Sequence, residues 1–160
     1  RGGCHLRAYP ISHEILRKPV ATDRFSFSGK ARIIKIAEDT NAAVDSLVAC
    51  KFSFFGATLE EYAELLSAVT GEEYGPQSLK ESGERIYLTE RFYNCANGFD
   101  AKDDKLPARF FREPGSSGEG IDIPPIDEKR FEEEMQKYYR IRGLTPRGTF
   151  TDPGFLERLP

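Results

Sequence analysis

The chain has 160 residues, of which 39% are hydrophobic and 12% aromatic, enough to build a packed core of about one domain rather than a disordered segment. Charged residues make up 31% of the chain but the net charge is only −3, which argues against a nucleic-acid-binding surface or a polybasic membrane anchor. No apolar run approaches the roughly 20 residues needed to cross a bilayer, and no segment looks like a signal peptide. We expect a cytoplasmic protein that binds neither nucleic acid nor membranes.

The three cysteines, Cys4, Cys50 and Cys95, are an odd number without a Cys-x-x-Cys pair. This disfavours a disulfide scaffold and a complete local metal site, so a metal bound by one of them would need ligands from elsewhere. The chain starts at Arg1 without an initiator Met and continues directly into Gly2-Gly3. We therefore expect a fragment of a larger protein.

Residues 1–29 combine a Gly-Gly pair with both histidines of the chain, and we expect a loop that enters a short helix capped by Ser12 and ended by Pro19. Residues 30–55 place their apolar side chains at the spacing of one buried helical face. The sequence predicts a helix there that Thr40-Asn41 bends or splits. The apolar positions are Ile33, Ile34, Ala37, Val44, Leu47, Val48 and Phe55.

An aspartate and a cysteine lie five residues apart in the apolar stretch 42–52, which we expect to be helical. Burying Asp45 without a partner would cost several kcal/mol, so its carboxylate must face water or meet a specific donor. A buried Cys50 is tolerated more easily as a small hydrophobic group. On an unbroken helix the two side chains would point about 140° apart and lie about 7.5 Å apart along the axis.

The remaining segments also read mainly as helices. Thr58 and Glu61 form a capping box for a helix that ends at Gly71, and Pro76 suits the first turn of a helix that runs to about residue 96. Residues 99–114 read as an ordered loop with one helical turn, 115–120 as a turn and 121–126 as extended. Asp127 caps a last helix that ends near Gly143. We predict a mainly α fold, an irregular multi-helix bundle with long ordered loops and no substantial sheet.

Six short motifs, in this order, resemble the C-terminal part of the tungsten-dependent aldehyde ferredoxin oxidoreductase family. They are Arg1-Gly2-Gly3-Cys4-His5-Leu6-Arg7-Ala8-Tyr9, Asp45-x-x-x-x-Cys50, Gly83-Glu84-Arg85-Ile86-Tyr87, Glu90-Arg91-Phe92-Tyr93-Asn94, Asp103-Asp104-x-Leu106-Pro107-x-Arg109-Phe110 and Tyr138-Tyr139-Arg140-Ile141-Arg142-Gly143. Each motif alone is weak, but all six in register cover nearly the whole chain.

The resemblance implies an enzyme that oxidises aldehydes to carboxylates at a tungsten-bispterin centre and passes electrons through a [4Fe-4S] cluster to ferredoxin. It leaves the aldehyde and the choice of tungsten or molybdenum open. It also implies upstream domains of the same polypeptide that supply most of both cofactor sites, and it allows a homodimer. Residues 1–160 would be one C-terminal helical region, with 1–29 facing the cofactors, 30–114 as helical core and 121–160 as C-terminal helix and tail.

By position in these motifs, the resemblance assigns His5 to the tungsten centre, where an imidazole can shuttle a proton. Arg1 and Arg7 match basic positions near the pterin. Asp45 matches an aspartate that accepts hydrogen bonds from the pterin amino groups. The neighbour whose backbone contacts the pterin is Ala49, and Cys50 matches the fourth cluster ligand, the other three lying upstream.

The chain departs from the family at one point, since Val48-Ala49 stands where the family often has Gly-Leu before the cysteine. Each residue also has a plainer interpretation: Cys50 as a packed thiol, Asp45 as a solvated helix residue, His5 as a structural histidine. Cys4 and Cys95 are expected to be structural. The alternative function is a cofactor-free helical binding or assembly domain that has kept the family's packing residues.

Overall fold

The computed structural model describes residues 4–17, 20–116, 118, 120–152 and 154. Its fold is mainly helical, as predicted, and its only sheet within the described residues is a two-stranded hairpin. The elements in chain order are α1 (Ile11–Glu14), α2 (Lys30–Ser46), the 3-10 helix η1 (Lys51–Phe55), α3 (Leu59–Thr70), α4 (Pro76–Ala96), α5 (Arg109–Arg112), β1 (Gly115–Ser116), β2 (Asp122–Ile123) and α6 (Glu128–Ile141).

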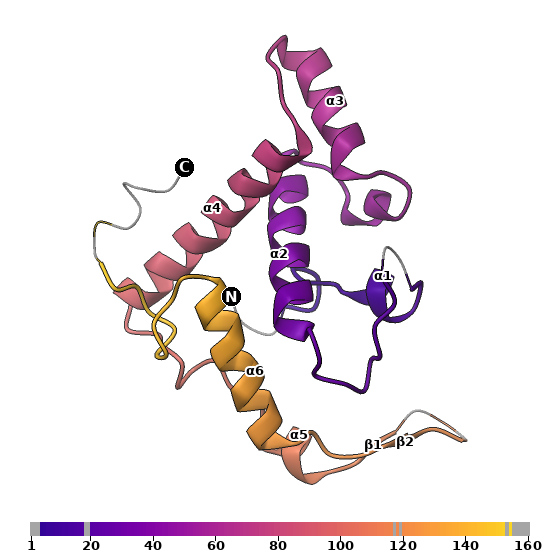
Figure 1. The fold of residues 1–160 in the computed structure, drawn as a ribbon, viewed down its shortest axis with the longest axis vertical. Coiled ribbons are helices and arrows are strands. Elements are labelled where there is room, and N and C mark those ends of the chain that lie inside the picture. The colour runs from indigo at the N-terminus through magenta and orange to yellow at the C-terminus, as the bar shows by residue number, and fades with distance from the viewer. Residues whose placement is uncertain (1–3, 18–19, 117, 119, 153, 155–160) are drawn as a thin grey trace.

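Helix α2 forms the centre of the molecule and packs against both α4 and α6 (Figure 1). The crossing with α4 is close because Gly83 lacks a side chain: a Cβ there would overlap the Asp39 carbonyl and lie 3.2 Å from the Ala43 nitrogen. Helix α3 and the β1–β2 hairpin lie at opposite ends of the long axis of the molecule (Figure 1). The middle of the structure is therefore a three-helix unit built around α2.

Two apolar clusters flank the helix crossing. One joins the end of α2 to α3 and the start of α4, and its buried members are Ala43, Val44, Tyr62, Ala63 and Leu79. The other joins the start of α2 to α6 and the segment after it, with Ala31, Tyr138, Tyr139 and Leu144 buried. Helix α2 thus contributes to both clusters and ties them together.

Charged groups are buried between the clusters. The Arg142 side chain, with 0% exposure, forms ion pairs with Asp39 and Glu38, and its guanidinium lies 3.9 Å from the centroid of the Tyr87 ring. At the other end of α2, Glu134 of α6 accepts a hydrogen bond of 2.9 Å from the Ala31 nitrogen. This bond satisfies one of the unpaired N–H groups of the first turn, where Gly29 offers no capping side chain.

Local sequence signals placed several helix ends correctly. Glu61 accepts a 2.6 Å hydrogen bond from the Thr58 nitrogen in the predicted capping box of α3. Pro76 begins α4, and Asp127 caps α6 by accepting a hydrogen bond from the Arg130 nitrogen at 3.0 Å. The described part of the chain contains no helix with both the length and the apolar character of a membrane span.

The predictions for α1 and α2 were partly wrong. Helix α1 starts at Ile11 after Pro10, so Ser12 is not its N-cap, and Pro19 lies outside the described residues. Helix α2 runs through Thr40-Asn41 without a break because both residues are buried inside the fold, and Asn41 bonds to the N-terminal loop. It ends at Ser46, well before residue 55, so the stretch 42–52 is α-helical only as far as Ser46, and its last two residues begin the 3-10 helix η1.

Candidate functional site

Two loops that are distant in sequence lie together at the C-terminal end of α2. The first, residues 4–9, is tied to α2 by the Asn41 amide, which donates to the carbonyl oxygens of Arg7 at 2.8 Å and Ala8 at 3.4 Å. The second, residues 45–55, reaches back through Lys51, whose Nζ lies 3.4 Å from the Leu6 oxygen. We call these the N-terminal loop and the α2–η1 segment. They bring His5, Arg7, Asp45, Ala49 and Cys50 onto neighbouring segments.

Aromatic contacts reinforce this arrangement. The Tyr9 ring of the N-terminal loop contacts the rings of Phe52 and Phe55, each at 6.0 Å between centroids. Both phenylalanines remain about half exposed, at 56% and 46%. The loops are therefore held by ring contacts that leave apolar surface open beside the candidate site.

Asp45 lies in the last turn of α2, where a carboxylate faces the negative end of the helix dipole. Two cations offset that disadvantage: its Oδ2 lies 3.0 Å from Lys51 Nζ and 3.6 Å from Arg7 Nη1. The side chain is still 36% exposed. The charge of Asp45 is thus partly screened by these cations, but its carboxylate is still accessible. It could therefore accept a hydrogen bond from a bound group.

The chain leaves α2 after Ser46 through an uncommon backbone conformation at Val48. Val48 has φ 58°, in the left-handed region that glycine adopts easily and β-branched residues avoid, and its side chain is 94% exposed. A glycine, which the resemblance leads us to expect at this position, would adopt this positive φ without strain. Ala49 follows, packed against the cluster of Ala43 and Val44.

Cys50 follows this turn as an exposed free thiol. Its carbonyl oxygen accepts the 3.0 Å hydrogen bond from the Ser53 nitrogen that starts η1. Because η1 and the turn at Val48 fix the backbone on both sides, the thiol is held at the surface. The interpretation of Cys50 as a packed core thiol does not agree with this exposure.

Arg7 is buried at 5% exposure, unlike an ordinary surface arginine. Its Nη2 donates to Glu90 Oε1 of α4 at 2.6 Å. Its Nε and Nη1 find no hydrogen-bond acceptor among the residues that the structure describes. His5, two residues earlier, is exposed on the same loop, and Arg1 lies outside the described residues.

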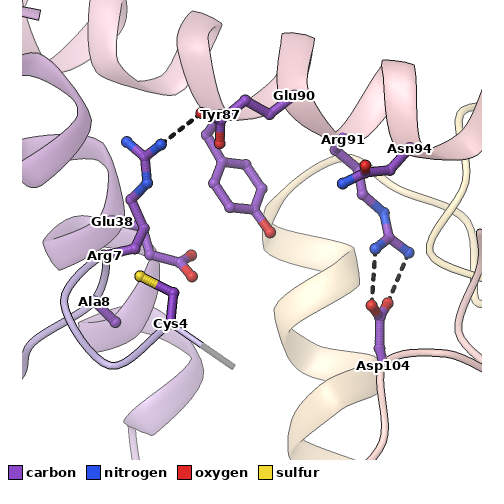
Figure 2. Close-up of a pocket in the computed structure, with 9 residues that line it drawn as sticks. All are labelled: Cys4, Arg7, Ala8, Glu38, Tyr87, Glu90, Arg91, Asn94 and Asp104. Atoms are coloured by element: carbon purple, nitrogen blue, oxygen red, sulfur yellow. Dashed lines mark hydrogen bonds and ion pairs between the residues drawn. The ribbon is translucent and has the colours of Figure 1, made fainter. Parts of the chain in front are cut away.

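A polar cavity of about 190 Å³ extends from this loop between α2 and α4 (Figure 2). Burial raises the pKa of the Glu38 carboxyl there, against the opposing effects of Tyr138 and Arg142, and raises the pKa of the Tyr87 hydroxyl to about 12. On the opposite side of the cavity from Arg7, Arg91 donates two hydrogen bonds to the Asp104 carboxylate, at 2.9 and 2.7 Å. The lining residues are Cys4, Arg7, Ala8, Glu38, Tyr87, Glu90, Arg91, Asn94 and Asp104.

Sequence reasoning missed three residues that organise the site: Asn41, Lys51 and Glu90. Asn41 was assigned to a helix break, although it is the residue that binds the N-terminal loop. Lys51 directly follows Cys50, so its proximity to Asp45 could have been suspected from the spacing alone. Glu90 had no such signal, because it lies 83 residues from the arginine that it binds.

The described residues contain no group of three His, Cys, Asp or Glu side chains placed to hold a metal ion. The donor set is nevertheless suited to a shared site, because an exposed thiol can supply one of the four thiolates that an iron-sulfur cluster needs. The exposed Asp45 carboxylate is an acceptor for N–H donors of a bound group. The residues present therefore fit one part of each cofactor site.

A family model described as "Aldehyde ferredoxin oxidoreductase, domains 2 & 3" matches residues 1–159. The chain belongs to this family. Two curated relatives of the aldehyde ferredoxin oxidoreductase family are both named tungsten-containing aldehyde ferredoxin oxidoreductase. The one from Pyrococcus furiosus is 37% identical over 152 residues, which cover 92% of this chain and 24% of the relative. The one from Pyrococcus horikoshii is 35% identical over 161 residues, which cover 98% of this chain and 26% of the relative.

The chain thus spans about a quarter of the length of these tungsten-containing oxidoreductases. Among solved structures, one chain titled the active site complex BamBC of benzoyl coenzyme A reductase, in complex with 1,5-dienoyl-CoA, has a similar fold. The TM-score is 0.66 at 17% identity, over 85% of this chain and 21% of that one. At this identity the likeness extends to the fold alone.

Proposed function

We propose that the chain is the C-terminal part of an enzyme that oxidises aldehydes to carboxylates, with electrons passing through a [4Fe-4S] cluster to ferredoxin. The observation that carries the proposal is the α2–η1 segment of this family member, which presents the Asp45 carboxylate and the Cys50 thiol at the surface. Two groups of this chemistry, three residues before and two residues after the strained residue Val48, are suited to two adjacent bound groups. Residues 1–160 alone would be inactive.

Each predicted site residue has a role in this proposal. When bound, a tungsten-bispterin centre supplies two-electron oxidation, and the cluster carries electrons onward singly. Asp45 would accept hydrogen bonds from pterin N–H groups, and Cys50 would ligate the cluster as a thiolate. His5, exposed on the N-terminal loop, would move a proton at the reacting centre.

The remaining assignments concern the pterin surroundings. Ala49 would contact the pterin through its backbone, and Arg1 would add positive charge. Arg7 would act from within the fold, since its guanidinium is buried and bound to Glu90. We further propose the division into a cofactor-facing segment 1–29, a core 30–114 and a C-terminal part 121–160. The intact protein would be cytoplasmic, with upstream domains covering the α2–η1 segment and a homodimer as its assembly.

Anaerobic production of the full-length protein tests this proposal directly. We expect bound iron, bound tungsten or molybdenum, and reduction of a viologen dye that depends on added aldehyde. A protein with neither cluster nor activity would support the cofactor-free assembly domain instead.

A pair of cysteine variants separates ligation from folding. Cys50→Ala should lose or convert the [4Fe-4S] signal in electron paramagnetic resonance spectra of the reduced full-length protein. Cys95→Ala is the matched control, because that half-buried thiol points at the Gly148 carbonyl oxygen, 3.7 Å away, and not at the loops. An unchanged cluster in the Cys50 variant would remove this residue from the site.

A further inference from the structure

We propose that the polar cavity between α2 and α4 is a hydrated chamber through which protons leave the reaction, with the Glu38 carboxyl as their acceptor. This inference rests on the proposed function. In that reaction a water oxygen is added to the aldehyde carbon and its C–H bond breaks, which gives a carboxylic acid, two protons and two electrons; ionisation of the acid to the carboxylate then releases a third proton. The two electrons go to ferredoxin, one at a time, so the protons need a separate route.

The cavity is built to hold water. Its volume of about 190 Å³ leaves room for several water molecules, because roughly 10–15 Å³ of space for the centre of a water molecule is enough to admit one. Arg7, which is more than nine-tenths buried, lines the cavity and donates from Nη2 to Glu90 Oε1 at 2.6 Å, whereas its Nε has no acceptor among the described residues and its Nη1 has only the ion-pair contact with Asp45 at 3.6 Å. These two nitrogens are closed off from solvent, so water in the cavity would instead meet the polar groups of Glu38, Tyr87 and Asn94.

Glu38 offers the chamber a free oxygen. Both of its hydrogen bonds, from Tyr138 and from Arg142 Nη2 at 2.9 Å, end on Oε2. No hydrogen bond from the described residues ends on Oε1. Figure 2 shows the Glu38 carboxylate and the Tyr87 hydroxyl pointing into the space between Arg7 and the Arg91–Asp104 pair. Oε1 can therefore take a proton from water while Oε2 keeps its position in the fold.

The chamber also reaches the loop that carries the predicted proton carrier. Cys4 lines it at the end nearest the N-terminal loop, and the next residue is His5, the predicted proton carrier. A proton released by His5 would therefore enter the chamber at Cys4 and cross it through water to Glu38.

Charged and titratable groups approach Glu38 from every element around it. Burial raises its pKa, and the neighbouring Asp39 carboxylate acts in the same direction, whereas Tyr138 and Arg142 lower it. The balance leaves a carboxyl that accepts protons more readily than an exposed glutamate does. The groups around it are Asp39 on α2, Tyr87 and Arg91 on α4, Tyr138 on α6, Arg142 directly after α6, and Cys4 and Arg7 on the N-terminal loop.

The test compares two variants of the full-length enzyme that weaken the same ion-pair network. Glu38→Gln removes the proton acceptor, and Asp39→Asn, its control, removes the other carboxylate from Arg142 outside the cavity. For Glu38→Gln we expect kcat to fall about tenfold or more relative to wild type, while KM stays within about twofold. The solvent deuterium isotope effect on kcat should be larger than in wild type, and added imidazole should restore part of the lost rate. Asp39→Asn should show neither the isotope effect nor the recovery. Equal behaviour of the two variants would overturn the proposal.

Two further measurements test the proposal even if the Glu38→Gln variant does not fold. Asn94→Leu replaces a cavity-lining amide with an apolar side chain of similar size, and should lower kcat and raise the isotope effect without changing Tm. Wild-type kinetics in that variant would contradict a water path. The second is infrared spectroscopy of the resting wild-type protein, where a buried carboxyl should protonate at higher pH than ordinary glutamates.

A wild-type protein that lacks aldehyde oxidation would defeat the proposed function. An infrared titration without a late-titrating carboxyl would defeat the chamber alone. The two failures are therefore distinguishable.

Discussion

The middle and the C-terminal end of α2 hold their charged groups in opposite ways. In the middle of the helix, Asp39 is completely buried and its charge is balanced by Arg142. At the C-terminal end, Asp45 is exposed and shares two more loosely placed cations, Arg7 and Lys51. The first arrangement is closed and holds three helices together. The second leaves an acceptor accessible, so one helix serves both the core and the candidate cofactor site.

The largest effect should come from breaking the buried ion pairs in the middle of α2. Arg142→Ala leaves Asp39 and Glu38 buried without their main cation, and breaking a buried ion pair in this way typically costs about 3–5 kcal/mol. We expect a loss of this size in the free energy of unfolding, measured by pulse proteolysis of the full-length protein in urea. Arg147→Ala is the control, because that side chain is 79% exposed in its pair with Asp100 and should cost less than about 1 kcal/mol. A similar loss of stability in both variants would mean that the buried ion pairs of Arg142 stabilise the fold no more than an exposed pair does.

The helix crossing gives the second prediction. Gly83→Ala adds a Cβ that overlaps the Asp39 carbonyl of α2, and backbone cannot move aside as a flexible side chain can. Overpacking typically costs about 1–3 kcal/mol, which exceeds the gain of about 1 kcal/mol from replacing glycine in a helix. The same proteolysis assay should show net destabilisation, whereas Ser82→Ala on the exposed side of α4 should be nearly neutral. A stabilised Gly83→Ala variant would show that the two helices are less closely packed than described.

A pH titration sharpens the comparison further. Burial raises the pKa of Glu38, so the folded protein holds this proton at pH values where the unfolded chain has released it. Stability from this group is complete below the unfolded-state pKa of about 4.5 and declines as pH rises through the folded-state value.

Glu38→Gln should remove this decline, so wild type loses stability relative to the variant as the pH is raised. The free energy of unfolding of both proteins, measured at several pH values, tests this prediction. The control is Glu113→Gln, which changes an exposed glutamate. Parallel pH profiles for wild type and Glu38→Gln would contradict the direction of the shift.

Local signals made much of the fold predictable. The capping box at Thr58, Pro76 at the start of α4 and Asp127 before α6 act within one helical turn, so the sequence alone identifies them. The end of α2 had no such signal, because no glycine follows Ser46 and the left-handed residue is a valine. The periodic pattern therefore predicted a longer helix than the chain forms.

The candidate site divides in the same way. The positions of Asp45 and Cys50 come from a motif with fixed spacing, and the structure places both at the surface. The bond between Arg7 and Glu90 joins residues 83 apart, and that between Arg142 and Asp39 joins residues 103 apart. Nothing in the local sequence encodes such pairs, since they depend on how α2 crosses its neighbours.

The smallest predicted effect is also the most specific for the open end of α2. Val48 holds φ 58° with its side chain 94% exposed, so it has a strained backbone and little packing to lose. Val48→Gly should therefore stabilise the full-length protein by about 1 kcal/mol, since the left-handed conformation costs other residues about 1–2 kcal/mol.

Val69→Gly is the matched control, because this valine is 85% exposed within α3, and there glycine should destabilise by a few tenths of a kcal/mol. If the free energy of unfolding rises in Val48→Gly and falls in Val69→Gly, the backbone strain lies at the turn before Cys50. A loss of stability in Val48→Gly would instead mean that this side chain packs against the rest of the enzyme, and that the turn is held in its strained form by that contact.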